Sequence, residues 1–247
     1  MANSMKLGMF ITGTDTTVGK TLVTAALAWS LKELGLGVGV MKPVETGVVK
    51  GRPSDAVRLA RAAQVSDSLD LVRPYTFRLP VAPLDAARTE RRTIKISTIM
   101  KAYRVLQAQH DLLLIEGVGG VHVPITPTMD VLDLIEKLKA PVLVVGQAGL
   151  GGVNHAMLTL NALRARAIPI LALVLNQTVP VKTAVGRRQE RSTMSLLREF
   201  SGVPVIGPLP YMAGVDARFD WAVETMAANS EMKKLTKLVL ASARGSR

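Results

Sequence analysis

The chain has no cysteine, three histidines and few aromatic residues, and these absences exclude several kinds of protein. Without cysteine there is no disulfide framework, cysteine nucleophile or cysteine-ligated metal centre. The scattered histidines argue against a zinc site built mainly of imidazoles. The longest apolar runs have the length of a strand, whereas a membrane span needs roughly 18 or more apolar residues. The first residues lack the pattern of a signal peptide, so we expect a cytoplasmic protein with no membrane partner.

Positive charge is in excess, with a formal net charge of +12. Such a charge raises the possibility of a nucleic-acid partner. However, the basic residues are spread along the chain, gathering mildly at residues 88–104, 187–191 and 233–247, and only 4% of residues are aromatic and able to stack on bases. We therefore interpret the charge as solvated basic surface and expect no nucleic-acid partner.

Short apolar runs alternate with amphipathic segments, without repeats or linker-like stretches. The apolar runs predict strands at residues 7–12, 38–41, 112–116, 142–146, 170–175 and 203–206. The amphipathic segments predict helices at residues 21–34, 54–63, 97–109, 131–138, 154–166, 188–200, 217–227 and 231–243. Strands without polar alternation are buried on both faces. The pattern therefore predicts one α/β domain over residues 1–247, with a mostly parallel central sheet flanked by helices on both faces.

A phosphate-binding loop is predicted where GTDTTVGKT, residues 13–21, joins the first strand to the first helix. Backbone N–H groups of such a loop cradle phosphates, its lysine reaches the β- and γ-phosphates, and the following hydroxyl holds Mg²⁺. The loop has five residues between its glycines, where the usual pattern has four. The residues expected to contact ATP here are Thr16, Thr17, Val18, Gly19, Lys20, Thr21 and Leu22.

An acidic residue, Glu116, ends the apolar strand at residues 112–116 and is followed by Gly117, Val118 and Gly119. In P-loop proteins an acid at this place holds Mg²⁺, and the glycines let the backbone approach the nucleotide. A turn of the form EGxGG is the alternative. However, an acid at the end of a buried strand is costly without a partner, so we favour the metal-binding role.

Two further polar segments follow the second strand. Lys42 comes directly after it and is fixed by a proline, so it can neutralise a phosphate or a carboxylated substrate; an ordinary surface lysine is the alternative. Ser54 and Asp55 begin a helix, and either could simply cap it.

The late strands end in groups suited to a purine pocket. Asn176 and Gln177 offer amides to a base edge, and Pro208, Leu209 and Pro210 offer apolar faces. Either segment alone is also compatible with an ordinary turn.

Together these segments resemble the dethiobiotin synthetase family over nearly the whole chain and in the same order. The matching motifs are TGTDTTVGKT (12–21), KPVETG (42–47), SDA (54–56), PYTFRLPVAP (74–83), IEGVGG (115–120), VLVVGQAGLGGVNHAMLT (142–159), Asn176 and GPLP (207–210). The GTDTxVGKT form with its extra residue is characteristic of that family, which accounts for the irregular spacing.

The resemblance implies a P-loop fold and ATP-dependent closure of a cyclic urea from the diamine diaminopelargonate and CO₂, through a carbamate and a carbamic–phosphoric anhydride. It implies that Lys20 and Lys42 face the carbamate and the γ-phosphate. It also implies that Thr21, Asp55 and Glu116 surround Mg²⁺, that Thr46 contacts the substrate, and that Asn176, Gln177, Pro208, Leu209 and Pro210 surround adenine. Leu150, Gly151 and Asn154 would hold the substrate carboxylate across a homodimer interface.

Departures and alternatives remain. Thr17 stands where some members carry an acid, Thr46 where serine is common, and Gln177 where aspartate is frequent, which loosens the expected choice of base. A relative of cobyrinate diamide synthases is disfavoured because it would need a glutaminase domain with a cysteine. A partition-type ATPase that binds DNA or a surface is the other alternative; that family has a lysine where this chain has Asp15.

Overall fold

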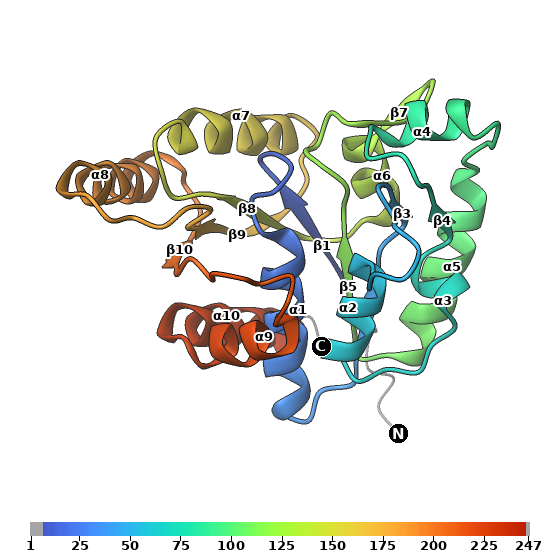
Figure 1. The fold of residues 1–247 in the computed structure, drawn as a ribbon, viewed down its shortest axis with the longest axis horizontal. Coiled ribbons are helices and arrows are strands. Elements are labelled where there is room, and N and C mark those ends of the chain that lie inside the picture. The colour runs from blue at the N-terminus through green and yellow to red at the C-terminus, as the bar shows by residue number, and fades with distance from the viewer. Residues whose placement is uncertain (1–6, 246–247) are drawn as a thin grey trace.

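The computed structural model describes residues 7–245 and is built around a six-stranded sheet (Figure 1). All its strand pairings are parallel. In spatial order the strands are β10 (Val205–Leu209), β9 (Ile170–Asn176), β8 (Val142–Gln147), β1 (Leu7–Gly13), β5 (Leu112–Glu116) and β2 (Val38–Met41). Two short segments lie outside the described residues. They are residues 1–6, which belong to the segment interpreted as lacking a signal peptide, and residues 246–247 of the basic tail.

Two hydrophobic cores cover the two faces of this sheet. One core contains Leu27, Leu59, Val223 and Leu235 and joins the sheet to α1 (Lys20–Glu33), α2 (Asp55–Ala62), α9 (Phe219–Ala228) and α10 (Ser230–Gly245). The other joins the opposite face to α4 (Pro83–Thr89), α5 (Ile96–Gln109), α6 (Val131–Leu138), α7 (Gly152–Ala165) and α8 (Ala184–Phe200). In Figure 1, α9 and α10 lie below the sheet and α7 above it. The predicted α/β architecture with helices on both faces is confirmed.

Alternate residues of a strand supply the two cores. In β1, Met9 and Ile11 belong to one core and Phe10 to the other, and all are buried. This explains why the strands have no polar alternation, as parallel sheets covered on both faces require.

Strand register brings three functional segments to one edge of the sheet. Ile11 pairs with Glu116 two residues before the P-loop begins, and Met41 pairs with Ile115. Lys42, the next residue after Met41, therefore lies beside Glu116. Because ligands of open α/β sheets bind at the carboxyl ends of the strands, this edge is where a site is expected.

The short elements carry no periodic signal and were not identified from the sequence. They are β3 (Val44–Glu45) paired with β4 (Tyr75–Thr76), β6 (Pro124–Thr126) paired with β7 (Met129–Asp130), and the short helices α3 (Leu69–Val72) and α4 (Pro83–Thr89). The β3–β4 pair lies next to the carboxyl end of β2, so these elements shape the edge that carries the site.

Several predicted helix starts are wrong. α8 begins at Ala184 rather than at residue 188, because the Thr183 hydroxyl accepts a hydrogen bond from Gly186 N at 3.0 Å and caps an earlier turn. α5 begins at Ile96, before Ser97, because Lys95 N donates to the Tyr75 hydroxyl at 2.9 Å and fixes the chain there.

The start of α7 and the end of β10 also differ from expectation. α7 begins at Gly152, so Asn154 lies in its first turn and does not cap it. β10 continues to Leu209, so Pro208 and Leu209 belong to the strand instead of following it. An edge strand accommodates proline there, and the pairing with β9 shifts register between Ile206 and Leu209.

Candidate active site

A cavity of about 780 Å³ opens at the carboxyl edge of the sheet. Its lining comes from segments that are far apart in sequence: the P-loop, the ends of β2 and β5, the start of α2, and the loop before α9. The lining residues are Thr16, Thr17, Gly19, Lys20, Thr21, Leu22, Lys42, Glu45, Thr46, Asp55, Arg58, Pro80, Val81, Ala82, Pro83, Glu116, Val118, Gly119, Val123, Val215, Asp216 and Phe219. Most of the predicted phosphate, metal and substrate residues therefore meet in one place.

The P-loop is shaped by backbone that few residue types tolerate. Gly19, which precedes α1, has φ +96°, and a Cβ there would collide with the side-chain amide of Asn176. That amide donates to Val18 O at 3.0 Å, so Asn176 at the end of β9 holds the loop from behind. Thr17 also has a positive φ of 56°. The loop is thus preformed, with the N-terminus of α1 facing the cavity, which suits a bound phosphate.

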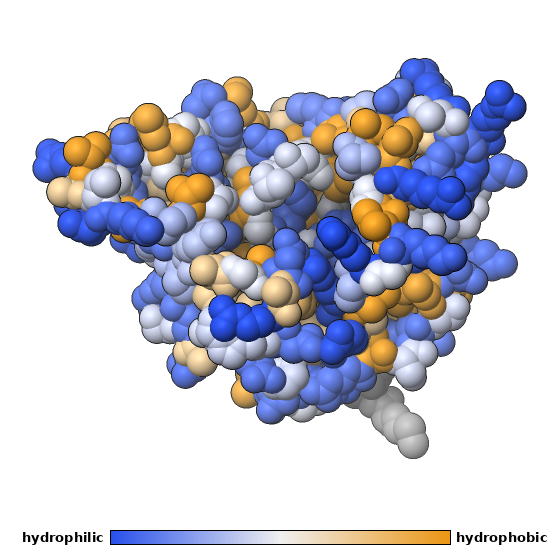
Figure 2. All heavy atoms as spheres, viewed as in Figure 1, coloured by the Kyte–Doolittle hydropathy of each residue, from blue (hydrophilic) through white to orange (hydrophobic). Residues whose placement is uncertain are grey.

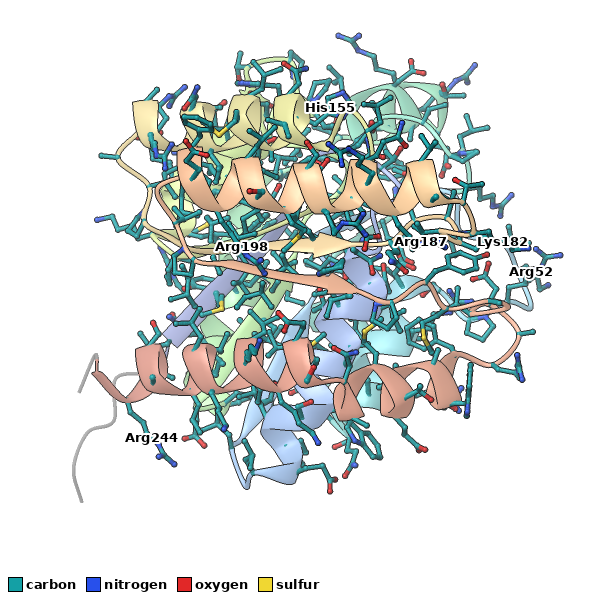
Figure 3. The ribbon with its side chains drawn as sticks, turned by 90° about the vertical axis from the view of Figure 1, so that its left-hand side faces the viewer. Arg52, His155, Lys182, Arg187, Arg198 and Arg244 are labelled. Carbon is teal, nitrogen blue, oxygen red and sulfur yellow. The ribbon has the colours of Figure 1, made fainter. Side chains whose placement is uncertain are left out.

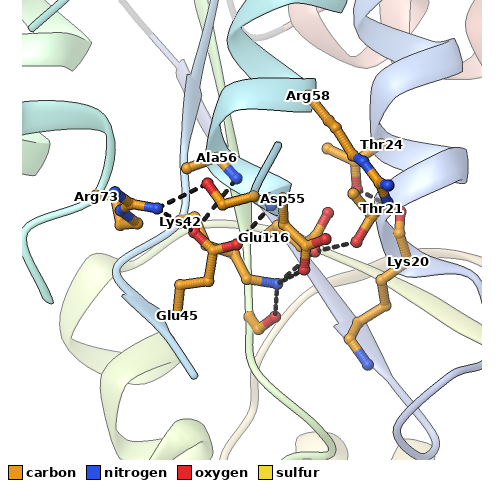
Figure 4. A network of polar contacts seen from close by, with 12 residues as sticks. Lys20, Thr21, Thr24, Lys42, Glu45, Asp55, Ala56, Arg58, Arg73 and Glu116 are labelled. Carbon is orange, nitrogen blue, oxygen red and sulfur yellow. Dashed lines mark hydrogen bonds and ion pairs between the residues drawn. The ribbon is translucent and has the colours of Figure 1, made fainter. Parts of the chain in front are cut away.

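Lys20, at the start of α1, is buried and folds back on its own loop, donating to Asp15 O at 2.8 Å. In Figure 4 its ammonium points away from the Lys42 cluster. Burial and the nearby charge of Lys42 lower the pKa of Lys20 to about 8. An anionic ligand in the cavity would place negative charge beside this lysine and so stabilise its protonated form.

Lys42 lies at the centre of a buried polar cluster (Figure 4). Its ammonium is 2.5 Å from Glu116 Oε1 and 3.2 Å from Asp55 Oδ2, and it donates to Gly117 O at 3.3 Å. Thr21 Oγ1 donates to the same Glu116 oxygen at 2.8 Å. Burial alone would lower the pKa of Lys42, but the carboxylates of Glu116 and Asp55 outweigh it and raise that pKa above its ordinary value. Lys42 is therefore a permanent cation inside the site.

The cluster suits Mg²⁺ chemically. Glu116 is fully buried, and among residues 7–245 its Oε2 has no hydrogen-bond partner. The hydroxyl of Thr21 and the carboxylate of Asp55 complete a set of oxygen donors around it. The described residues contain no group of three or more acidic, histidine or cysteine side chains placed to hold a metal alone. Mg²⁺ binds through one or two carboxylates together with water and phosphate oxygens, and the oxygens of Thr21, Asp55 and Glu116 are of this kind.

The residues predicted to bind the base lie outside the lining of this cavity. Asn176 supports the P-loop, as described above. Gln177 is engaged at both ends, donating to Glu190 at 2.6 Å and accepting from Tyr211 N at 3.0 Å. Pro208 borders a separate groove beside α8. The prediction that these residues surround adenine stays a prediction.

The loop predicted to serve a neighbouring subunit also lies away from the cavity. Leu150 is 75% exposed, and its carbonyl accepts from Gln147 Nε2 at 3.0 Å. Gly151 has φ +86° and turns the chain into α7, and Asn154 is exposed on the first turn.

Several residues at the site were missed by sequence reasoning. Arg58, on α2, contacts Asp216 Oδ1 at 2.9 Å and lies over the Phe219 ring at 4.8 Å, which ties α2 to the loop before α9. The apolar wall at residues 80–83 comes from the proline-rich motif, whose prolines are its only local signal. Neither Ser54 nor Asp55 caps α2 with its side chain; Glu45, from β3, bonds the first N–H groups of that helix instead.

Comparison with known proteins agrees with this geometry. A family model described as an AAA domain matches residues 8–218. The ATP-dependent dethiobiotin synthetase BioD of Thermodesulfovibrio yellowstonii is 38% identical over 245 residues, covering 95% of this chain and all of that protein. The BioD proteins of Anaeromyxobacter sp. (strain Fw109-5) and Bacillus cereus (strain ATCC 14579) are 48% and 38% identical, covering 69% and 84% of this chain and 76% and 84% of their own lengths. The chain belongs to the dethiobiotin synthetase family.

Solved structures place this family member among P-loop folds. The MinC:MinD cell division complex of Aquifex aeolicus aligns with TM-score 0.55 at 15% identity, covering 94% of this chain and 96% of that one. A ParA family ATPase from Chlorobium tepidum aligns with TM-score 0.54 at 14% identity, covering 96% and 98%. At such low identity the likeness shows the fold alone. Over residues 7–245, no helix has the length and apolar character that crossing a bilayer demands.

Proposed function

We propose that this chain is an ATP-dependent dethiobiotin synthetase that forms the ureido ring from diaminopelargonate and CO₂. One amine takes up CO₂ and loses a proton to become a carbamate. The carbamate oxygen then attacks the γ-phosphorus of ATP, ADP leaves, and a carbamic–phosphoric anhydride forms. The second amine attacks the carbamate carbon, phosphate leaves, and loss of a proton completes the cyclic urea.

The observation that carries the proposal is the buried Lys42, which stands beside the P-loop in the same cavity as Thr46. A P-loop is sufficient to bind a triphosphate. A second buried cation beside the P-loop is needed when another anion must approach that triphosphate. Carbamate and γ-phosphate are both anionic. Lys42 and Lys20 bring them together and stabilise the charge that develops during transfer.

The cluster around Glu116 would hold Mg²⁺, through Thr21, Asp55 and the free Glu116 Oε2. When bound, the metal would neutralise phosphate charge. In the structure Lys42 contacts Glu116 Oε1 and Asp55 Oδ2, and Thr21 Oγ1 donates to Glu116 Oε1, so these side chains are already gathered at the end of the P-loop.

The remaining lining residues orient the substrate. Thr46 offers a hydroxyl and Gly47 follows at φ +76°, while Pro80, Val81 and Pro83 give an apolar wall on which a hydrocarbon chain can pack. No side-chain nucleophile is needed, because the second amine of the substrate attacks the anhydride held next to it. A requirement for ATP also supports the cytoplasmic location expected from the sequence.

Turnover tests this proposal directly. ATP hydrolysis should require both diaminopelargonate and bicarbonate, and mass spectrometry should detect the urea product. ATP hydrolysis that ignores the diamine but responds to DNA would favour a partition-type ATPase instead. The distribution of charge disfavours that outcome: in Figure 3, Arg52, Lys182 and Arg187 lie toward one side of the view, whereas Arg198 lies toward the other end of α8 and Arg244 at the far end of α10, so the labelled basic residues are not all in one patch.

We further propose that the active unit is a homodimer in which the loop around Leu150 binds the carboxylate tail of the substrate in the neighbouring site. The P-loop and Lys42 are taken up by the phosphates and the carbamate, so the far end of the substrate needs another anchor. The loop leads into the N-terminus of α7, which favours an anion. Two exposed apolar side chains lie in or near this loop, Leu150 at 75% and Leu158 at 61% exposure. Hydrophilic residues cover most of the face of the molecule drawn in Figure 2.

Asn154→Ala tests the substrate-binding role of this loop better than a bulky change at Gly151, where φ +86° would strain any side chain. We expect the KM for the diamine to rise while ATP affinity stays unchanged. Mixing Lys42→Ala chains with Asn154→Ala chains should restore part of the lost activity. A fully active monomer in light scattering would contradict the dimer proposal.

A further inference from the structure

Glu45 is a buried carboxylate at the edge of the cavity. It ends β3, is 4% exposed, and follows Lys42 by three residues. Its backbone is fixed by pairing with Thr76 of β4. Because an isolated buried carboxylate is costly, its partners indicate what the residue does.

Both carboxylate oxygens of Glu45 are used to hold the start of α2. Oε1 accepts from Asp55 N at 2.5 Å, and Oε2 accepts from Ala56 N at 3.5 Å. These are N–H groups of the first turn, which have no partner within the helix. Glu45 thus caps α2 from another element.

Arg73 fixes Glu45 in this role. Its Nη1 lies 3.0 Å from Glu45 Oε2 and also donates to Ser54 Oγ at 2.7 Å. Ser54 is at the cap position of α2, so its hydroxyl is engaged by Arg73 and the capping falls to Glu45. Figure 4 shows Arg73, Glu45 and the start of α2 as one chain of polar contacts beside Lys42.

The consequence falls on Asp55. An acidic side chain in the first turn of a helix is commonly stabilised by the positive end of that helix. Here Glu45 takes that place, and the Asp55 carboxylate is free to reach Lys42 at 3.2 Å. The backbone of Asp55 is held by β3 while its side chain faces the cluster.

We infer that Glu45, anchored by Arg73, is a positioning residue that presents the Asp55 carboxylate to the metal–phosphate end of the site. The inference rests on the proposed function for the metal role of Asp55. Glu45 itself touches neither nucleotide nor metal in this assignment; it acts through the position of α2.

Metal binding in the presence of nucleotide tests the inference without turnover. Mn²⁺ is titrated into the protein with ADP and followed by electron paramagnetic resonance. Glu45→Ala should weaken Mn²⁺ binding by on the order of ten-fold, as losses of supporting contacts around metal ligands do. Glu45→Gln should lose less affinity than Glu45→Ala, because its one amide oxygen can still accept from Asp55 N, although its NH₂ group no longer accepts from Ala56 N or Arg73.

A matched control separates positioning from stability. Asn229 Oδ1 accepts from Glu231 N at 2.9 Å at the start of α10, a helix that lies below the sheet in Figure 1. Asn229→Ala removes a comparable helix-terminal hydrogen bond and should leave Mn²⁺ binding unchanged. If Glu45→Ala does not fold, Arg73→Met is used in its place. This variant keeps the Glu45 carboxylate but removes the arginine that fixes it, and it should also weaken Mn²⁺ binding.

The outcomes distinguish the two proposals. Absence of diamine-dependent turnover by the unaltered protein would overturn the proposed function, while the Mn²⁺ titration would still report on Glu45. Unchanged Mn²⁺ affinity in Glu45→Ala, or in Arg73→Met if the former is unfolded, overturns the positioning role. Equal losses in Glu45→Gln and Glu45→Ala, or in Asn229→Ala, overturn it as well, because they would point to charge or general stability instead.

Discussion

The phosphate end of the cavity and the segment predicted to bind the base, here called the base end, differ in how their polar side chains are used. At the phosphate end, Lys42, Glu116 and Asp55 face one another inside the cavity, and Glu116 has an oxygen to spare within the described chain. At the base end, Asn176 and Gln177 donate their amide hydrogens to the protein itself. Asn176 Oδ1 is also buried without a partner among residues 7–245, so the difference lies in the amide nitrogens, which hold loops in place, and in the charged groups of the first set, which face a cavity.

This difference follows from the elements that carry the residues. The phosphate-end groups end buried parallel strands or begin helices beside them, so strand register fixes their position. Gln177 lies where β9 meets the loop after β10, so its contact with Tyr211 N depends on how that loop folds, whereas Asn176 contacts the P-loop at Val18 O. Changes at the phosphate end should therefore be costly to catalysis, and changes at the base end mild.

Lys42→Ala should give the largest effect. We expect kcat to fall about 10²–10³-fold, equivalent to about 2.7–4 kcal/mol, if Lys42 stabilises developing charge as an oxyanion donor does. Stability should fall too, by about 3–5 kcal/mol, because buried Glu116 loses its charged partner. Steady-state kinetics and thermal unfolding measure the two effects, and Lys137→Ala on the exposed surface of α6 serves as the control.

A double variant separates catalysis from folding. Lys42→Met combined with Glu116→Gln removes both buried charges, so much of the stability should return, whereas turnover should stay lost. Near-normal kcat in either Lys42 variant would remove this lysine from the chemistry.

Metal dependence should show the next largest effect. Asp55→Asn keeps the size of the side chain but loses its charge, and Glu116→Gln does the same at the buried position. We expect the Mg²⁺ concentration for half-maximal turnover to rise on the order of ten-fold or more. Asp70→Asn, an exposed acid in the first turn of α3, is the matched control. Unchanged Mg²⁺ titrations for both site variants would show that these carboxylates do not hold the metal.

Lys20 allows a test by proton uptake. Its pKa of about 8 in the free protein leaves it largely neutral at about pH 9. Phosphates bound beside it favour the charged form and raise that pKa, so ATP binding should take up as much as one proton per site. Calorimetry in buffers of different ionisation enthalpy measures this uptake. Lys20→Arg, which stays protonated, should abolish the uptake; its persistence would assign the proton to another group.

The same group has a defined effect on stability. Since the folded pKa lies below the unfolded value of 10.5, the unfolded chain binds more protons between about pH 8 and 10.5. Lys20 therefore contributes stability that increases as pH rises through this window. Lys42 acts in the opposite sense, but only above 10.5, because its folded pKa is raised.

Sequence reasoning identified the long elements and the phosphate end because both depend on local pattern. Continuous apolar runs marked the buried strands, periodic apolar residues marked the amphipathic helices, and polar groups at strand ends marked the site. It missed β3 and β4 because two-residue strands carry no periodicity. It missed the cap of α2 because the residue that provides it, Glu45, lies in β3. Glu45 and Arg73, 28 residues apart, meet only through tertiary structure. The observed bounds of β10 and the observed start of α7 differ from the predicted ones. Tertiary contacts, and not the local preferences of the residues, determine where these elements begin and end.

Gln177→Ala should give the smallest effect and sharpens the comparison most. Gln177 accepts from Tyr211 N and donates to Glu190, so its removal frees the loop after β10 without taking a ligand from the phosphates. The bond to Tyr211 N is the one that holds this loop, and losing one such hydrogen bond is worth about 0.5–1.5 kcal/mol, which predicts an increase in the Kd for ATP of roughly 2- to 12-fold with kcat nearly unchanged. Titration with ATP and with a pyrimidine triphosphate measures both affinity and base choice. If ATP affinity falls far beyond this range while the pyrimidine nucleotide is unaffected, Gln177 contacts the purine directly, and the base end then binds its part of the ligand as specifically as the phosphate end does.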